Sequence, residues 1–113
     1  MKYLINESQV LNIVKKYLDD IDWAIMDYNE WEMTRLFFKD QMQYPDDAIF
    51  ESYTEEDEDE GISERILLVK REFFMKLKHL FGLTTKQLAN FLLQWYQSYT
   101  NEKVDKLHLE FMD

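Results

Sequence analysis

The 113-residue chain lacks cysteine and contains only one proline and two glycines. Without cysteine it has no disulfide framework, thiolate metal ligand or thiol nucleophile, and this absence fits a reducing compartment. Two glycines and one proline leave no room for a phosphate-cradling loop, a collagen-like segment or a linker-rich region. The unbroken apolar runs are only a few residues long, which excludes a transmembrane helix, and the opening segment 1–5 is too short for a signal peptide.

Bases are scarce in the first half of the chain. Residues 1–60 hold 17 acids and 5 bases (net −12), and residues 61–113 hold 6 acids and 8 bases (net +2), which together give −10. Ten acids and no base lie between Asp40 and Glu60, and six adjacent carboxylates, Glu55 to Glu60, end this stretch. Adjacent like charges must stay hydrated or face a cationic partner. We therefore expect an acidic surface loop at 55–61, and no direct binding to DNA or RNA, which requires clustered bases.

Hydrophobic residues make up 46% of the chain and aromatic residues 16%, too much for a disordered protein. A chain of this length forms one core, so we expect a single domain over residues 1–113. Three segments have helical spacing: one opens at Asn6 with Gln9 in the capping-box position, one ends at Gly82, and one begins with the capping box Thr84 to Gln87. Their apolar stripes are Val10, Ile13, Val14, Tyr17 and Leu18; Phe73, Phe74, Leu77, Leu80 and Phe81; and Leu88, Phe91, Leu92, Trp95, Tyr96 and Tyr99.

The segment 22–54 fits two patterns. Its alternation and aromatic content favour two strands around a turn at Asn29-Glu30, whereas a helix over 29–43 is the alternative, because Trp31, Arg35 and Phe38 also fit the helical period. Residues 44–47 form a turn around Pro45, and residues 48–54 form a further strand.

Two more strands are predicted in the second half. Residues 65–69 are apolar enough for a strand that is buried on both faces, and residues 104–111 alternate as a half-buried strand does. The mixed order of helices and strands predicts an α+β fold, with a small antiparallel sheet of three to five strands covered by about three helices.

The opening Lys2-Tyr3-Leu4-Ile5-Asn6-Glu7-Ser8-Gln9 and the stretch from Val69 to Trp95 resemble small uncharacterised proteins of tailed phages and related environmental viruses. In those chains a capped amphipathic helix precedes a few strands, and a Phe-Phe…Leu-Phe-Gly-Leu helix precedes a helix that carries a tryptophan. The resemblance implies a viral or mobile-element origin and a cytoplasmic site of action, in the host cell if the protein is viral. It implies no catalytic residue.

The sequence holds no recognisable catalytic or metal-binding motif. The two histidines, His79 and His108, have no partner at zinc-ligand spacing, and no serine lies in a nucleophile elbow. Asp19, Asp20 and Asp22 are close enough in sequence for weak cation binding, and a metal-dependent hydrolase that uses them is the least favoured hypothesis. We expect no enzymatic activity, no metal site and no cofactor.

The leading hypothesis is an acidic protein-binding module that engages a basic partner surface and does not contact a membrane. Aromatic rings among carboxylates suit a protein interface, and one specific form is a viral inhibitor whose carboxylates mimic the phosphates of nucleic acid. The alternative is a small virion structural or assembly protein, a homo-oligomer that self-associates through the edge strand 104–111. The predicted partner-binding residues are Tyr44, Asp46, Asp47, Glu51, Tyr53, Glu55, Glu56, Asp57, Glu58, Asp59 and Glu60.

Overall fold

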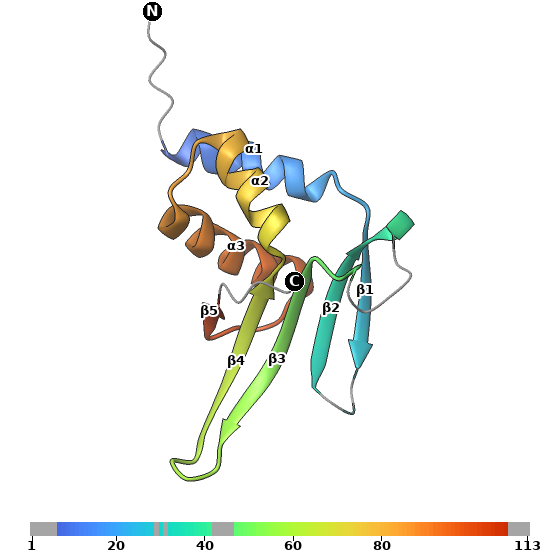
Figure 1. Ribbon diagram of the computed structural model, residues 1–113, viewed down its shortest axis with the longest axis vertical. Helices are drawn as coiled ribbons and strands as arrows, with labels where there is room; N and C mark the ends of the chain where they lie inside the picture. The colour runs from blue at the N-terminus through green and yellow to red at the C-terminus, as the bar shows by residue number, and fades with distance from the viewer. Residues whose placement is uncertain (1–6, 29, 31, 42–46, 109–113) are drawn as a thin grey trace, which may run out of the picture.

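A five-stranded sheet and three α-helices form the protein, in a computed structural model that describes residues 7–28, 30, 32–41 and 47–108 (Figure 1). A short 3₁₀ helix, η2, occupies Lys39–Gln41 after the second strand. No helix in these residues is both long and apolar enough to cross a bilayer. The elements in chain order are α1 (Glu7–Asp19), β1 (Trp23–Tyr28), β2 (Met33–Phe38), β3 (Phe50–Asp57), β4 (Ile62–Val69), α2 (Arg71–Phe81), α3 (Thr85–Thr100) and β5 (Lys106–His108).

The strands lie in the sheet in the order β1-β2-β3-β4-β5. The first four are joined by antiparallel pairing, whereas β5 runs parallel to β4, with Ile66 opposite Lys106 and Leu67 opposite Leu107. Parallel neighbours need a long crossover, and α2 and α3 provide it here. The predicted α+β fold is confirmed, and five strands lie within the predicted range. The sheet is antiparallel except for its last pair.

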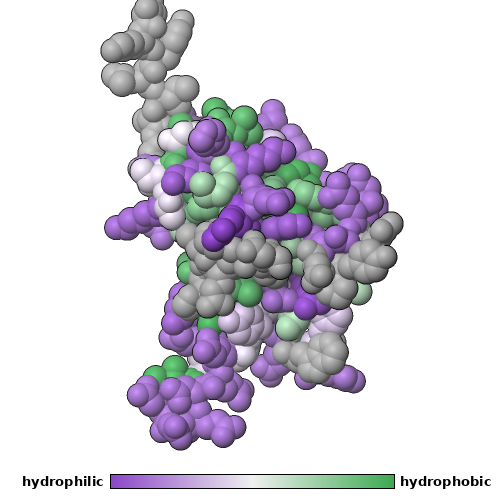
Figure 2. Space-filling model, in the orientation of Figure 1, coloured by the Kyte–Doolittle hydropathy of each residue, from purple (hydrophilic) through white to green (hydrophobic). Residues whose placement is uncertain are grey.

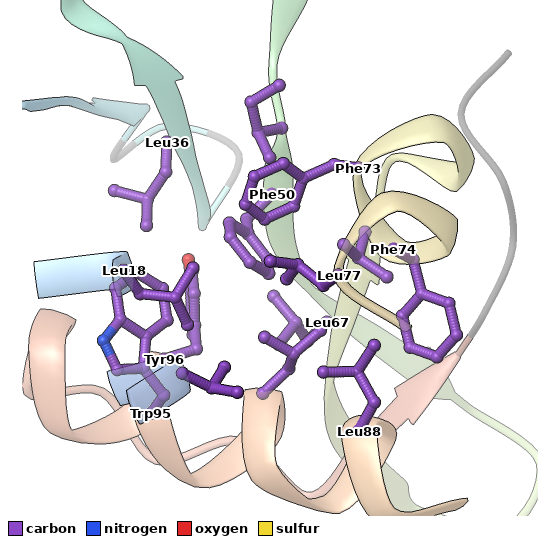
Figure 3. Packing of buried hydrophobic residues seen from close by; sticks show 14 of the residues in the cluster. Leu18, Leu36, Phe50, Leu67, Phe73, Phe74, Leu77, Leu88, Trp95 and Tyr96 are labelled. Atoms are coloured by element: carbon purple, nitrogen blue, oxygen red, sulfur yellow. The ribbon is translucent and has the colours of Figure 1, made fainter. Parts of the chain in front are cut away.

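The helices cover one face of the sheet and enclose the core against it (Figures 1 and 3). Figure 3 shows Leu88, Trp95 and Tyr96 of α3 pointing toward the strand residues Phe50 and Leu67. Trp23 at the start of β1 joins this core, with ring centroids 5.7 Å from Phe50 and 5.6 Å from Trp95. Burial of each large apolar side chain stabilises the fold by about 1.5–3 kcal/mol. The fully buried members of this core are Val14, Leu18, Leu36, Phe50, Leu67, Val69, Phe74, Leu77, Leu88, Leu92 and Tyr96.

The strand interpretation of segment 22–54 is confirmed by β1 and β2, and the helix alternative over 29–43 is wrong for residues 33–38. Trp23 pairs with Phe38 and Tyr28 with Met33, so the connection is longer than the expected two-residue turn at Asn29-Glu30. Of the expected turn at residues 44–47, residues 44–46 lie outside the described residues.

The helix-end signals are confirmed where the structure describes them. The hydroxyl of Thr84 accepts from the Gln87 N–H at 3.1 Å, and the Gln87 side chain accepts from the Thr84 N–H at 3.0 Å. Gly82 ends α2 at φ 63°, the left-handed region that favours glycine. Asn6, the predicted cap of α1, lies outside the described residues.

Three members of the apolar stripes are exposed rather than packed in the core: Ile13 (51%), Leu80 (59%) and Tyr99 (38%). Residues 66–69 of β4 are buried on both faces of the sheet, as predicted. The last strand is described only over Lys106–His108, where Leu107 packs against the core; residues 109–111 lie outside the described part.

Candidate protein-binding site: the acidic hairpin

The acidic hairpin consists of residues 55–64, the outer part of the β3–β4 hairpin. Glu55 lies opposite Glu64, Glu56 opposite Ser63 and Asp57 opposite Ile62. The expected loop at 55–61 is therefore shorter than predicted, because its first three carboxylates continue β3 and only residues 58–61 form the turn. The hairpin projects beyond the helices at one end of the molecule (Figure 1), so residues 55–63 are exposed.

The turn of the acidic hairpin is fixed by its own side chains. One carboxylate oxygen of Asp57 accepts from the N–H groups of Asp59 at 3.1 Å and Glu60 at 3.4 Å. Gly61 follows at φ 66°, where a side chain would strain the backbone. An aspartate that bonds the backbone two residues ahead, followed by glycine, is a stable turn arrangement. The carboxylates at the tip are thus presented from a defined backbone.

Negative charge on the acidic hairpin is only weakly compensated. The Glu64 carboxylate pairs with the Lys106 ammonium at 2.9 Å, and this hydrogen bond raises the pKa of Lys106. Within the described ranges, no base forms an ion pair with residues 55–60. Glu55 and Glu64 face each other directly, which destabilises an antiparallel pair. Figure 2 shows the resulting hydrophilic surface over the tip of the hairpin.

A shallow hollow of about 220 Å³ lies on one face of the acidic hairpin. It is lined by the alternate residues Glu55 and Asp57 of β3, by Ile62 and Glu64 of β4, and by Glu60 and Lys106. Ile62 is 46% exposed. This face therefore combines carboxylates with an apolar contact, the combination that a basic side chain with an aliphatic stem requires.

The other predicted partner-binding residues are not part of the acidic hairpin. The Glu51 carboxylate accepts from Arg35 Nε at 2.6 Å, and its side chain is only 13% exposed, so it belongs to the sheet rather than to an open surface. Tyr53 lies two residues before Glu55 on the same face and is half-buried, and Asp47 is also half-buried. Tyr44 and Asp46 lie outside the described residues. The structure thus gathers Glu55 to Glu60 at one place and leaves Glu51 out of it.

A polar network that the sequence did not predict joins the sheet to the end of α3. Arg65 donates through Nη2 to Ser52 Oγ at 3.1 Å and to Glu102 Oε1 at 3.3 Å. Glu102 also accepts from the hydroxyls of Ser52 at 2.9 Å and Thr34 at 2.5 Å. The Tyr96 hydroxyl lies 2.7 Å from Ser52 Oγ. Nothing in the spacing of these five residues along the chain signals that they meet.

This network satisfies its own members. Among the described residues, no buried side-chain nitrogen or oxygen lacks a hydrogen-bond partner. Burial is the main cause of a raised pKa at Tyr96. A fully buried tyrosine hydroxyl and a fully bonded serine are suited to hold β2, β3, β4 and the end of α3 together. We assign the network a structural role.

The carboxylates considered for cation binding do not converge. Asp19 accepts from Lys15 Nζ at 2.8 Å and from Trp95 Nε1 at 3.0 Å, and these two hydrogen bonds lower its pKa. In the described ranges, no three histidine, aspartate or glutamate side chains are placed to hold a metal ion. His79 is exposed on α2, and His108 lies on β5 opposite Leu68.

Comparison of the chain with protein-family models, curated proteins and solved structures finds no match. The acidic hairpin is therefore interpreted from its own geometry and charge.

Proposed function

We propose that this protein is a non-enzymatic protein-binding module whose acidic hairpin engages a basic surface on another protein. One observation carries the proposal: six consecutive carboxylates stand exposed on a projecting hairpin, and no base pairs with them within the described ranges. Uncompensated charge in one place attracts a partner of opposite sign and accelerates its association.

The hairpin shape suits a basic groove. Alternate residues on a strand lie about 6.6 Å apart on one face, so the hairpin presents separated negative charges along a narrow ribbon. A nucleic-acid strand presents its phosphates as a comparable row of charges. The specific form that we favour is thus an inhibitor that occupies the nucleic-acid-binding groove of its partner. The resemblance to phage proteins adds to this proposal an accessory role in the cytoplasm of an infected cell.

The experiment compares two variants of equal charge. In the hairpin variant, all six acids from Glu55 to Glu60 become amides, which preserves the side-chain shape and changes the net charge from −10 to −4. The matched control also loses six acids but keeps the hairpin, and all six positions are exposed. In this control, the six acids that become amides are Asp20, Asp22, Glu30, Glu32, Asp40 and Glu72.

Each protein is immobilised and used to capture partners from host lysate at low and at high salt. We expect the wild type and the matched control to capture the same basic protein at low salt, and the hairpin variant to lose it. Surface charge is screened within about 8–10 Å at physiological ionic strength, so high salt should release the partner. Retention by the hairpin variant contradicts the proposal. Displacement of nucleic acid from the captured protein then tests the inhibitor form.

A further inference from the structure

The two edges of the sheet differ in how well they are protected from pairing with another strand. Strand β5 forms one edge, is described over only three residues, and carries Lys106. Strand β1 forms the other edge over six residues, Trp-Ala-Ile-Met-Asp-Tyr, without lysine, proline or glycine. Its register with β2 is continuous, so it contains no bulge. Short length, lysine, proline and bulges are four of the usual means of protecting an edge, and β1 has none of these four.

Part of the β1 backbone points away from β2, toward this edge of the sheet. Lys39 N–H donates to the Asp22 carbonyl at 3.0 Å, which fixes the phase of the β1–β2 pairing. Because neighbouring residues of an antiparallel strand point alternately toward and away from the partner, the backbone groups of Trp23, Ile25 and Asp27 point away from β2. No backbone hydrogen bond to these outward groups is found within the described ranges.

Apolar side chains flank the same edge on both faces of the sheet. Ile25 is 47% exposed and its neighbour Met26 is 38% exposed on the opposite face. Strand β1 has one charged side chain, Asp27, whose carboxylate lies 2.9 Å from Thr34 Oγ1. An extended apolar edge of this kind adds a strand readily, since the backbone supplies the hydrogen bonds and the side chains supply buried area.

We propose that β1 pairs antiparallel with β1 of a second copy of this chain, which joins the two sheets into one continuous sheet. A two-fold axis at Ile25 places Ile25 opposite Ile25 of the second copy and Trp23 opposite its Asp27. All of these residues have outward backbone groups, so the register forms about six hydrogen bonds. Ala24 then faces Met26 of the second copy. The interface is the same patch on both copies, as two-fold symmetry requires.

The charges along β1 itself are compatible with a second copy as the occupant. In this register no carboxylate faces another, because Asp27 faces Trp23. Antiparallel pairing also reverses the direction of the second copy, so the two acidic hairpins point away from each other (Figure 1). The −10 charge of each copy still opposes association. Salt should therefore strengthen the dimer, whereas it should weaken the binding of a basic partner by the acidic hairpin. The two proposals are independent and respond to salt in opposite directions.

The test measures molecular mass and backbone protection on the intact protein. Sedimentation from micromolar to millimolar concentration should show the mass rising toward twice 13.9 kDa, and more readily at high salt. Amide hydrogen exchange should show the N–H groups of Trp23, Ile25 and Asp27 becoming protected as the dimer forms. A monomer at every concentration overturns the proposal, and so does a dimer in which these three amides exchange freely.

A matched pair of variants tests the position of the interface. Ile25→Lys places two ammonium groups opposite each other on the two-fold axis and should abolish the dimer. Ile13→Lys makes the same change at a side chain of similar exposure, 51% against 47%, on α1, and should leave the dimer intact. Circular dichroism confirms that both variants are folded. A dimer that survives Ile25→Lys, or that any added strand-forming peptide displaces without regard to its sequence, contradicts pairing between two β1 strands.

Discussion

At the scale of single residues, the ion pair between Arg65 and Glu102 is distinguished by its surroundings. Its side chains are 17% and 24% exposed, and both partners also bond hydroxyl groups of the sheet. The pair of Lys106 and Glu64 is 48% and 40% exposed. A charge that loses its partner costs several kcal/mol when buried and little when it stays hydrated.

We predict that Glu102→Gln lowers the free energy of unfolding by about 1–3 kcal/mol, because Arg65 is left partly buried without a counter-charge. The control is Glu64→Gln, the same chemical change in the exposed pair, for which we expect a smaller loss or none, because that pair is hydrated and the change also removes the repulsion between Glu64 and Glu55. Urea unfolding of both variants provides the measurement. Equal losses would show that the network contributes no more than a surface ion pair.

The buried hydroxyl of Tyr96 should make the free energy of unfolding fall as the pH rises above 10. Its pKa is raised in the folded protein, chiefly by burial, above the ordinary value of 10.0. Above pH 10 the unfolded chain loses this proton while the folded protein keeps it, so folding becomes less favourable as the pH rises. One such proton gives a slope of about 1.4 kcal/mol per pH unit.

Tyr96→Phe should therefore cost about 1 kcal/mol at neutral pH, from the lost bond to Ser52, and should lose stability less steeply than the wild type above pH 10. Tyr99→Phe, at a side chain that is 38% exposed on the same helix, is the control. Urea unfolding at several pH values provides the comparison. Parallel curves for wild type and Tyr96→Phe would contradict the assignment.

At the scale of elements, short sequence motifs predicted the features that depend only on residues close together in the chain. The capping box at Thr84 and the left-handed Gly82 are formed by neighbouring residues, so short motifs revealed them. The alternation in 33–38 was ambiguous alone, because the same residues fit a helix. The choice depended on pairing with β1 on one side and β3 on the other, which no local pattern contains.

The contacts that the sequence analysis missed join elements far apart in the chain. Ser52 and Glu102 are 50 residues apart, and Thr34 and Glu102 are 68 apart. No short-range pattern around Glu102 indicates either contact. Likewise, the charge count located Glu55 to Glu60, but only the β3–β4 register shows that three of them extend a strand and that Glu51 is occupied by Arg35.

At the scale of the whole molecule, the clustered charge of the acidic hairpin opposes folding. Glu55 faces Glu64 across the strands, and the six adjacent carboxylates add to the repulsion within a chain of net charge −10. Repulsion of this kind lowers the stability of a compact state. Binding sites commonly retain groups that are unfavourable for stability because function requires them.

We therefore predict that the hairpin variant, with residues 55–60 as amides, is more stable than the wild type at low salt. The gain should shrink at 1 M salt, where screening acts within about 3 Å. The matched control removes the same charge from scattered positions and should gain less, because its acids do not face one another. Thermal unfolding of the three proteins at two salt concentrations measures this difference. If the hairpin variant gains no more than the control, the clustered charge carries no folding penalty, and solubility alone suffices to explain it. If it gains more, and loses its partner as well, the cluster opposes folding and is retained for binding.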